Sequence, residues 1–189
     1  GISTAGDITT TNDAVTYNSA TTITGNVLVN TGAGAGTIQF ASTLDGTTAS
    51  TETLGLTAGT GDVTFANTVG AGTALGAVTV SSAKDVGLTN TFQAASFTQT
   101  AGTGTTTVGG LLTATTGNVS IKTAGIALNA CIDTATGAAG GTVTLNADTN
   151  ALTIAGAGDI TADGLVSLTG AGGISTAGDI TTTNDAVTY

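Results

Sequence analysis

The chain has 189 residues and a formal net charge of -10, although only 7% of its residues are charged. Its only basic residues are Lys84 and Lys122, which argues against nucleic acid as a partner, because phosphate binding requires several Lys or Arg side chains. Hydrophobic residues make up 40% of the chain, too many for a disordered polar segment. Gly or Thr interrupts every apolar run before it reaches the ~18–20 residues of a membrane helix, so we expect no membrane insertion.

The chain begins and ends with the same stretch of sequence. Residues 1–17 read GISTAGDITTTNDAVTY, and residues 173–189 repeat those letters. Gly173 therefore stands where Gly1 stood, which defines a period of 172 residues. A tandem repeat within a longer polymer has this form. We divide the chain into one repeat unit, residues 1–172, and the start of the next identical unit, residues 173–189.

A short phrase recurs along the chain: Gly, any residue, Val or Ile, any residue, and a large apolar residue. Such alternation is typical of a β-strand with one buried and one solvated face, and the Gly before it marks a turn. The inward pairs predicted in chain order are Val27/Val29, Ile38/Phe40, Val63/Phe65, Val78/Val80, Val119/Ile121, Val143/Leu145 and Val166/Leu168. The residue between each pair, usually Thr, Ser or Gln, is expected to face solvent. Gly-rich stretches at 31–36, 69–76 and 136–141 are predicted to be loops that widen corners.

Two all-β topologies can use such strands, an antiparallel sandwich or barrel and a β-solenoid with parallel pairing between stacked coils. Four observations favour the solenoid: the letter-for-letter long repeat, the recurrence of GD[IV]T at 6, 61, 158 and 178, the 3% aromatic content, and the rarity of two-residue hairpin signals. The spacing predicts ~20–27 residues per coil and about 7–8 coils in one repeat. At about 4.8 Å per coil, a repeat would lengthen a fibre by about 35–40 Å.

The phrases GDITTTNDAVTY, NTFQAASFTQTAGTGTTTVGG and AGGISTAGDIT resemble giant repetitive bacterial surface proteins, namely the filamentous-haemagglutinin-like adhesins and related beta-strand-repeat proteins. The resemblance covers the whole chain in composition and rhythm. It implies a right-handed parallel β-helix, secretion to the cell surface, and a role in adhesion, biofilm matrix or fibre formation. We therefore expect a structural segment of a long extracellular bacterial fibre, whose partners are identical repeats and neighbouring filaments.

Acidic residues are the only candidates for chemistry. Paired carboxylates such as Asp159 with Asp163, or Asp179 with Asp185, could do acid–base work on a sugar. The chain has no Arg or His to orient an anionic substrate, so we predict no enzyme activity and no obligatory cofactor. The stretch GAGDITADG (156–164) is the densest acidic turn and makes Asp159 and Asp163 weak candidates for Ca²⁺, although it fits neither the nonapeptide β-helix repeat nor the EF-hand spacing.

Cys131 is the only cysteine. It is either a small buried hydrophobic residue or the site of an intermolecular cross-link to a neighbouring chain. A catalytic thiol is not expected, because no His or Arg is present to lower its pKa.

Two other functions stay open at this stage. An adhesin would bind a host or glycan receptor through the Gly-rich corner loops. An ice-binding solenoid would use ladders of Thr, for which Thr22/Thr24, Thr98/Thr100 and the TTT runs at 9–11, 105–107 and 181–183 have the spacing of one strand face. The same Thr residues also suit an ordinary exposed β surface. A set of Asn residues at strand starts and turns is expected to stack as amide ladders; they are Asn26, Asn67, Asn90, Asn118, Asn129 and Asn146.

Overall fold

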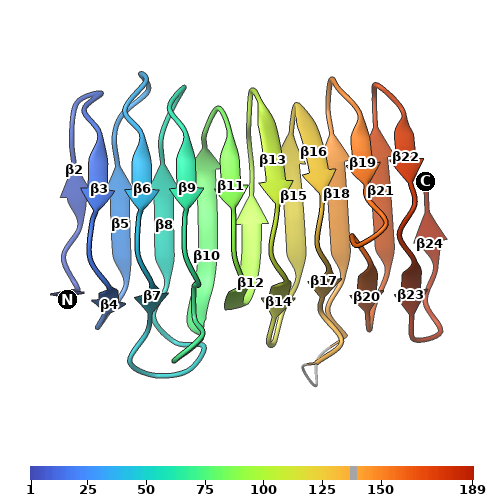
Figure 1. The fold of residues 1–189 in the computed structure, drawn as a ribbon, viewed down its shortest axis with the longest axis horizontal. Helices are drawn as coiled ribbons and strands as arrows, with labels where there is room; N and C mark the ends of the chain where they lie inside the picture. Colours follow the sequence, from blue (N-terminus) through green and yellow to red (C-terminus); the bar gives the residue numbers. More distant parts are fainter. Residues whose placement is uncertain (137–139) are drawn as a thin grey trace.

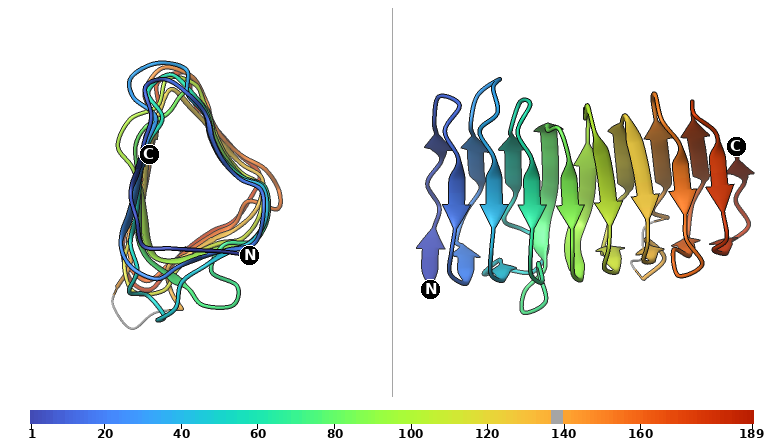
Figure 2. Two further views of the ribbon diagram at one scale, coloured as in Figure 1. Left: turned by 90° about the vertical axis from the view of Figure 1, so that its left-hand side faces the viewer. Right: turned by 45° about the horizontal axis from the view of Figure 1, so that its top comes forward.

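The computed structural model describes residues 1–136 and 140–189. Throughout these residues the chain forms β-strands and no helix, wound into a single column of coils with the two termini at opposite ends (Figure 1). Seen along the axis, the coils superimpose on one triangular outline (Figure 2). From the N-terminal end the chain runs clockwise as it recedes (Figure 2), so the coil is right-handed. The predicted parallel β-solenoid is confirmed.

The triangle has three faces, which the chain visits in a fixed order. The first face holds β1 (Ile2–Thr4), β4 (Thr21–Ile23), β7 (Leu44–Asp45), the start of β12 (Phe92–Gln99), β14 (Leu112–Ala114), β17 (Ile132–Asp133), β20 (Ile160–Ala162) and β23 (Ile180–Thr182). The second holds β2 (Ile8–Thr9), β5 (Val27–Asn30), β8 (Leu54–Thr57), β10 (Leu75–Ser82), the end of β12, β15 (Val119–Thr123), β18 (Val143–Ala147), β21 (Val166–Gly170) and β24 (Val187–Thr188). The third holds β3 (Val15–Tyr17), β6 (Ile38–Phe40), β9 (Val63–Phe65), β11 (Val86–Leu88), β13 (Thr105–Val108), β16 (Gly125–Leu128), β19 (Leu152–Ile154) and β22 (Ile174–Thr176).

Each strand pairs in parallel with the strand one coil before it and the strand one coil after it. On the first face, Ile2 lies opposite Thr21 and Ile132 lies opposite Ile160, so the shortest and the longest coil take 19 and 28 residues. This range is close to the predicted one. Between β7 and β12 the first face narrows to Val69, which bridges the coils on both sides.

The predicted inward pairs form the core. All fourteen side chains are at most 3% exposed, whereas Leu28, between Val27 and Val29, is 41% exposed. Alternation in the sequence thus determines which side chains face the axis. Burying these side chains requires neighbouring coils, because a single coil has apolar groups on one side only.

An aromatic stack lies inside the N-terminal half of the column. The rings of Tyr17 and Phe40 are parallel with centroids 4.6 Å apart, and Phe65 continues the stack at 5.2 Å from Phe40. Phe92 and Phe97 follow in edge-to-face contacts at 5.1 and 5.4 Å. Both geometries are favourable for aromatic rings. The stack confirms the inward positions of Phe40 and Phe65 and adds Phe92 and Phe97 to the core.

The corners contain the loops. The stretch 31–36 forms the predicted loop between β5 and β6, and residues 70–74 form a second one, while Val69 and Leu75 on its flanks join the sheets. Part of the predicted loop at 136–141 lies outside the described residues. The loop at 46–53, between β7 and β8, was not predicted and projects below the body in Figure 1.

Candidate functional site

The polar side chains at the corners connect one coil to the next. Asp7 Oδ1 accepts a hydrogen bond of 2.7 Å from the N–H of Leu28, one coil further on. The same contact recurs from Asn12 to Gly34, Asn26 to Thr53, Asp45 to Gly72, Asp62 to Asp85, Asp85 to Thr105, Asn118 to Thr142 and Asp159 to Asp179. Most of these bonds are exposed to solvent, so each side chain replaces water as the acceptor of its N–H group and contributes modestly to stability. The carboxylates and amides therefore act first as structural acceptors.

The predicted amide ladders are wrong for Asn26 and Asn118. Their side chains accept backbone N–H groups, and Asn90 donates to the carbonyl of Ala66. At the corners of Asn26 and Asn118 the next coil has Thr53 and Thr142 in place of a second Asn, and without identical residues in register side-chain amides cannot stack. Asn67 and Asn90 do occupy the same corner of consecutive coils, because Phe65 pairs with Leu88 before it and Val69 with Phe92 after it.

Asp159 and Asp163, the calcium candidates, flank β20. The three residues of this extended strand lie between them, which separates their Cα atoms by about 13 Å at ~3.3 Å per residue. The Oδ1 atom of Asp159 already accepts the N–H of Asp179 at 2.9 Å. In the described parts of the chain, no three His, Cys, Asp or Glu residues gather as a metal site. Calcium binding at this turn stays a prediction.

The second carboxylate pair also lies within the coil framework. Asp179 is the donor of the bond to Asp159, and the backbone carbonyl of Asp185 accepts the hydroxyl of Thr182 at 2.6 Å. The structure therefore places Asp179 and Asp185 at successive corners of the last coil. No pocket is found along the described residues.

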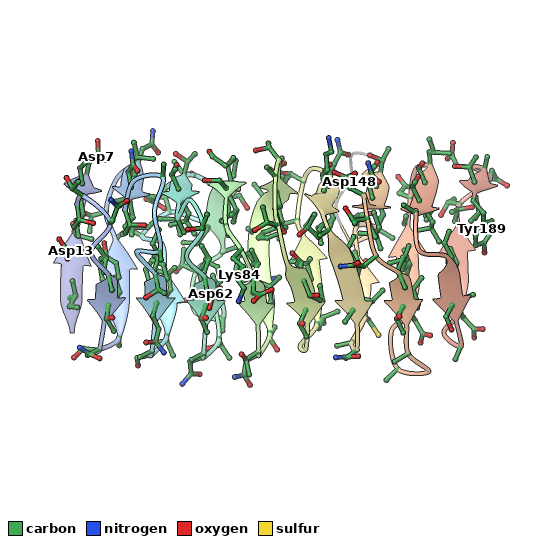
Figure 3. All side chains as sticks on the ribbon, turned by 90° about the horizontal axis from the view of Figure 1, so that it is seen from above. Asp7, Asp13, Asp62, Lys84, Asp148 and Tyr189 are labelled. Carbon is green, nitrogen blue, oxygen red and sulfur yellow. The ribbon has the colours of Figure 1, made fainter. Side chains whose placement is uncertain are left out.

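The two lysines form surface ion pairs. Lys84 Nζ lies 2.8 Å from Asp85 Oδ2 and 3.9 Å from Asp62 Oδ1, on the side shown in Figure 3. The hydrogen bond from Lys84, followed by the N–H of Thr105, lowers the pKa of Asp85, and the same bond raises the pKa of Lys84. Such exposed pairs contribute little to stability, because water and salt screen them. Lys122 approaches Asp148 at 3.7 Å.

Glu52 organises the unpredicted loop at 46–53. Its side chain is buried and accepts the hydroxyl and the N–H of Thr47 and the N–H of Thr48. The hydroxyl of Thr47 is the main cause of a lowered pKa for this carboxyl group, with desolvation opposing it. Glu52 is the only Glu among twelve acidic residues, which was the one sequence signal for this site.

Cys131 is half-buried at the corner before β17. Its thiol is free and its Sγ lies 3.6 Å from the carbonyl oxygen of Ala157, in the next coil. This position lies between the two alternatives, since the side chain is neither sealed in the core nor fully presented to a neighbouring chain.

The structure places the predicted Thr arrays on different faces: Thr22 and Thr181 lie on the first face, Thr9 on the second, and the run 105–107 on the third. A different set of hydroxyls, of which Thr98 is the only predicted member, forms one column on the second face. The residues that stack there, in successive coils, are Thr79, Thr98, Ser120, Thr144, Ser167 and Thr188. The neighbouring column is mixed, because Lys122 stacks on Asn146. At the N-terminal end the first column is broken as well, where Leu28 stacks on Gly55. The structure therefore brings together a hydroxyl column one residue wide.

Comparison with known proteins adds no relative. The chain gave no significant match to a family model, a curated protein or a solved structure. Within the residues described here, no helix is long and apolar enough to cross a bilayer.

Proposed function

We propose that this chain is a structural, non-catalytic segment of a long extracellular bacterial fibre built from tandem 172-residue repeats. The fibre would serve as a filament, a sheath or an adhesive stalk. The placement outside the cell rests on the sequence resemblance, and the role as a stacking unit rests on the architecture.

The observation that carries the proposal is the continuity of the stack. Parallel pairing between coils and an interior of apolar side chains run from the first coil to the last, also past the point where Val69 replaces a strand of the first face. In the terminal coils, Ile8 and Ile180 are only partly buried. A further coil stacked at each end would bury them, which supports the proposal.

The tyrosines near the two ends support the proposal. Tyr17 is 5% exposed and stacks on Phe40 of the next coil, whereas its copy Tyr189 is 72% exposed at the C-terminal end (Figure 3). An exposed aromatic ring next to unpaired strand edges marks a surface that favours association. A following repeat would cover it in the way the second coil covers Tyr17.

Chains of one, two and three repeats test the proposal. If repeats stack, electron microscopy shows rods that lengthen by about 37 Å per repeat, since each coil adds about 4.8 Å. The free energy of unfolding rises with each repeat, because every junction adds an interface. Rods of constant length, or chains of separate compact bodies, would contradict the proposal. Antibody labelling of intact source cells tests the location, and labelling confined to the cell interior would exclude an extracellular fibre.

A further inference from the structure

The two copies of the seventeen-residue stretch lie on different faces of the triangle. In the first copy, β1, β2 and β3 occupy the first, second and third faces. In the second copy, β22 lies on the third face, β23 on the first and β24 on the second. The pairing agrees: Ile2 lies opposite Thr21 of β4, whereas its copy Ile174 lies opposite Leu152 of β19.

The copies nevertheless have the same local conformation. Asn12 and Asn184 both have a φ of 64°, in the left-handed region. The hydroxyl of Thr10 donates to the carbonyl of Asp13 at 2.6 Å, and the corresponding bond in the second copy, at the next corner round the triangle, is also 2.6 Å. The last coil is thus the first coil turned about the axis, and it is not refolded.

The angle of rotation between the two copies follows from the number of face positions that the chain occupies between them. Over the described residues from β1 to β22 the chain occupies twenty-four positions, because Val69 stands in for one strand and β12 spans two faces. The copies are therefore 23 face-to-face steps apart. With three faces per coil, one 172-residue repeat makes seven and two-thirds turns.

We infer that consecutive repeats of this protein are rotated by one-third of a turn, so that the partner at each end is another copy of the chain in a different orientation about the axis. This inference rests on the proposed tandem fibre. Three repeats, 516 residues and 23 turns in all, restore the original orientation. The axial period would be about 110 Å at about 4.8 Å per coil.

The structure contains both halves of this junction. Above the first copy lie residues 21–40, which the next repeat would place above the second copy. Below the second copy lie residues 152–168, which the preceding repeat would place below the first copy. Superposing the two identical coils therefore completes the junction without any new contact.

The inward positions of this coil accept either orientation. Ile8 stacks on Val29 on the second face, and its copy Ile180 stacks on Ile160 on the first. An apolar residue meets an apolar residue in both cases, and neither orientation buries a charge. Ile2 lies opposite the buried Thr21 on the first face, whereas its copy Ile174 lies opposite Leu152 on the third. The packing therefore requires inward residues of moderate size that are apolar or, like Thr21, have a bonded hydroxyl.

The rotation would distribute each surface feature over three sides of the fibre. The loop at 46–53 and the ion pair of Lys84 would recur on a different side in each successive repeat. A neighbouring filament could then make the same lateral contact from three directions, which favours round bundles over flat ribbons.

Cysteine pairs in the chain as it stands test the orientation of the last coil. In a Cys131→Ser background, Thr153→Cys with Ser175→Cys places two outward residues in neighbouring strands of the third face. If the last coil instead kept the orientation of the first, Ser175 would lie beside Thr161 on the first face. A short bifunctional thiol reagent, followed by mass spectrometry of the digested protein, should join 153 to 175 and leave Thr161→Cys with Ser175→Cys unjoined. Preferential joining of 161 to 175 would overturn the inference.

The pair Ser3→Cys with Thr22→Cys is the matched control, because these residues are neighbours on the first face under either arrangement. A three-repeat chain imaged by electron cryomicroscopy then tests the array, with the loop at 46–53 as a marker. We expect successive loops one-third of a turn apart, and loops in line along one side would overturn the rotation. Failure of the three-repeat chain to form a rod would instead count against the proposed fibre, whatever the cross-linking result.

Discussion

Replacing Phe65 with Ala tests whether stacked coils stabilise each other through the aromatic contacts. Phe65 is 1% exposed and lies between Phe40, parallel at 5.2 Å, and Phe92, edge-on at 5.1 Å. Truncating a buried Phe to Ala costs about 3–5 kcal/mol. Because Phe65 loses aromatic partners in both neighbouring coils, we expect a loss of about 4 kcal/mol, a large part of the ~5–15 kcal/mol of an ordinary domain.

Urea unfolding followed by circular dichroism measures this loss. With a slope of about 2 kcal/mol per M, the midpoint should fall by about 2 M. Leu28→Ala is the control, since that side chain faces outward, is 41% exposed and should change the free energy by no more than about 1 kcal/mol. A double-mutant cycle with Phe40→Leu and Phe65→Leu should give a coupling of about 0.5–1.5 kcal/mol. The reasoning is refuted if Phe65→Ala costs no more than Leu28→Ala.

Three further predictions use matched or single changes at other positions. Gly61→Ala should strongly destabilise the fold, because its Cβ would collide with the backbone of Gly36 in the preceding coil, whereas Gly156→Ala, with open space around it, should change the urea midpoint little. Glu52→Gln should weaken the bonds that its carboxylate accepts in the loop at 46–53, and we expect faster hydrogen exchange there with little change in the strands. The pKa values of Glu52 and Asp85 are lowered, which means that the folded state binds their protons less tightly than the unfolded chain does. Their contribution to stability is therefore fully present above an ordinary carboxyl pKa of about 4. It is lost as the pH falls through the pKa values of the folded state. Urea midpoints should therefore fall between pH 6 and pH 3, and Asp85→Asn should reduce that slope; an unchanged slope would count against this carboxylate.

The fold could be predicted because its two sequence signals, the alternation of apolar and polar residues and the turn residues between strands, are both local. Each Val-x-Val phrase has one face that must be buried, and the Gly, Asn and Asp residues between phrases mark corners. These signals do not state how long each corner loop is. The loop at 46–53 depends on a carboxylate that bonds to residues four and five positions before it, a contact that leaves no periodic trace.

The sequence could not assign each strand to one of the three faces, for a related reason. Alternation distinguishes inside from outside but not one side of a triangle from another. β12 continues round a corner and serves two faces, and Val69 replaces a whole strand. A count of phrases alone therefore gave the approximate number of coils without the fractional turn.

The two-thirds of a turn left over in each repeat also helps to decide between a structural fibre and a binding surface such as an ice-binding face. A flat binding face, such as an ice-binding surface of Thr, requires equivalent residues to stay on one side, so its repeat must contain a whole number of coils. A repeat of seven and two-thirds turns would move the hydroxyl column of Thr79 to Thr188 to a new side in every unit, so no side of the fibre would have a continuous column. A fibre that works by its length and stiffness has no such constraint, because every orientation buries the same inward residues. The offset between the two copies of residues 1–17 therefore favours a structural role over a one-sided binding surface.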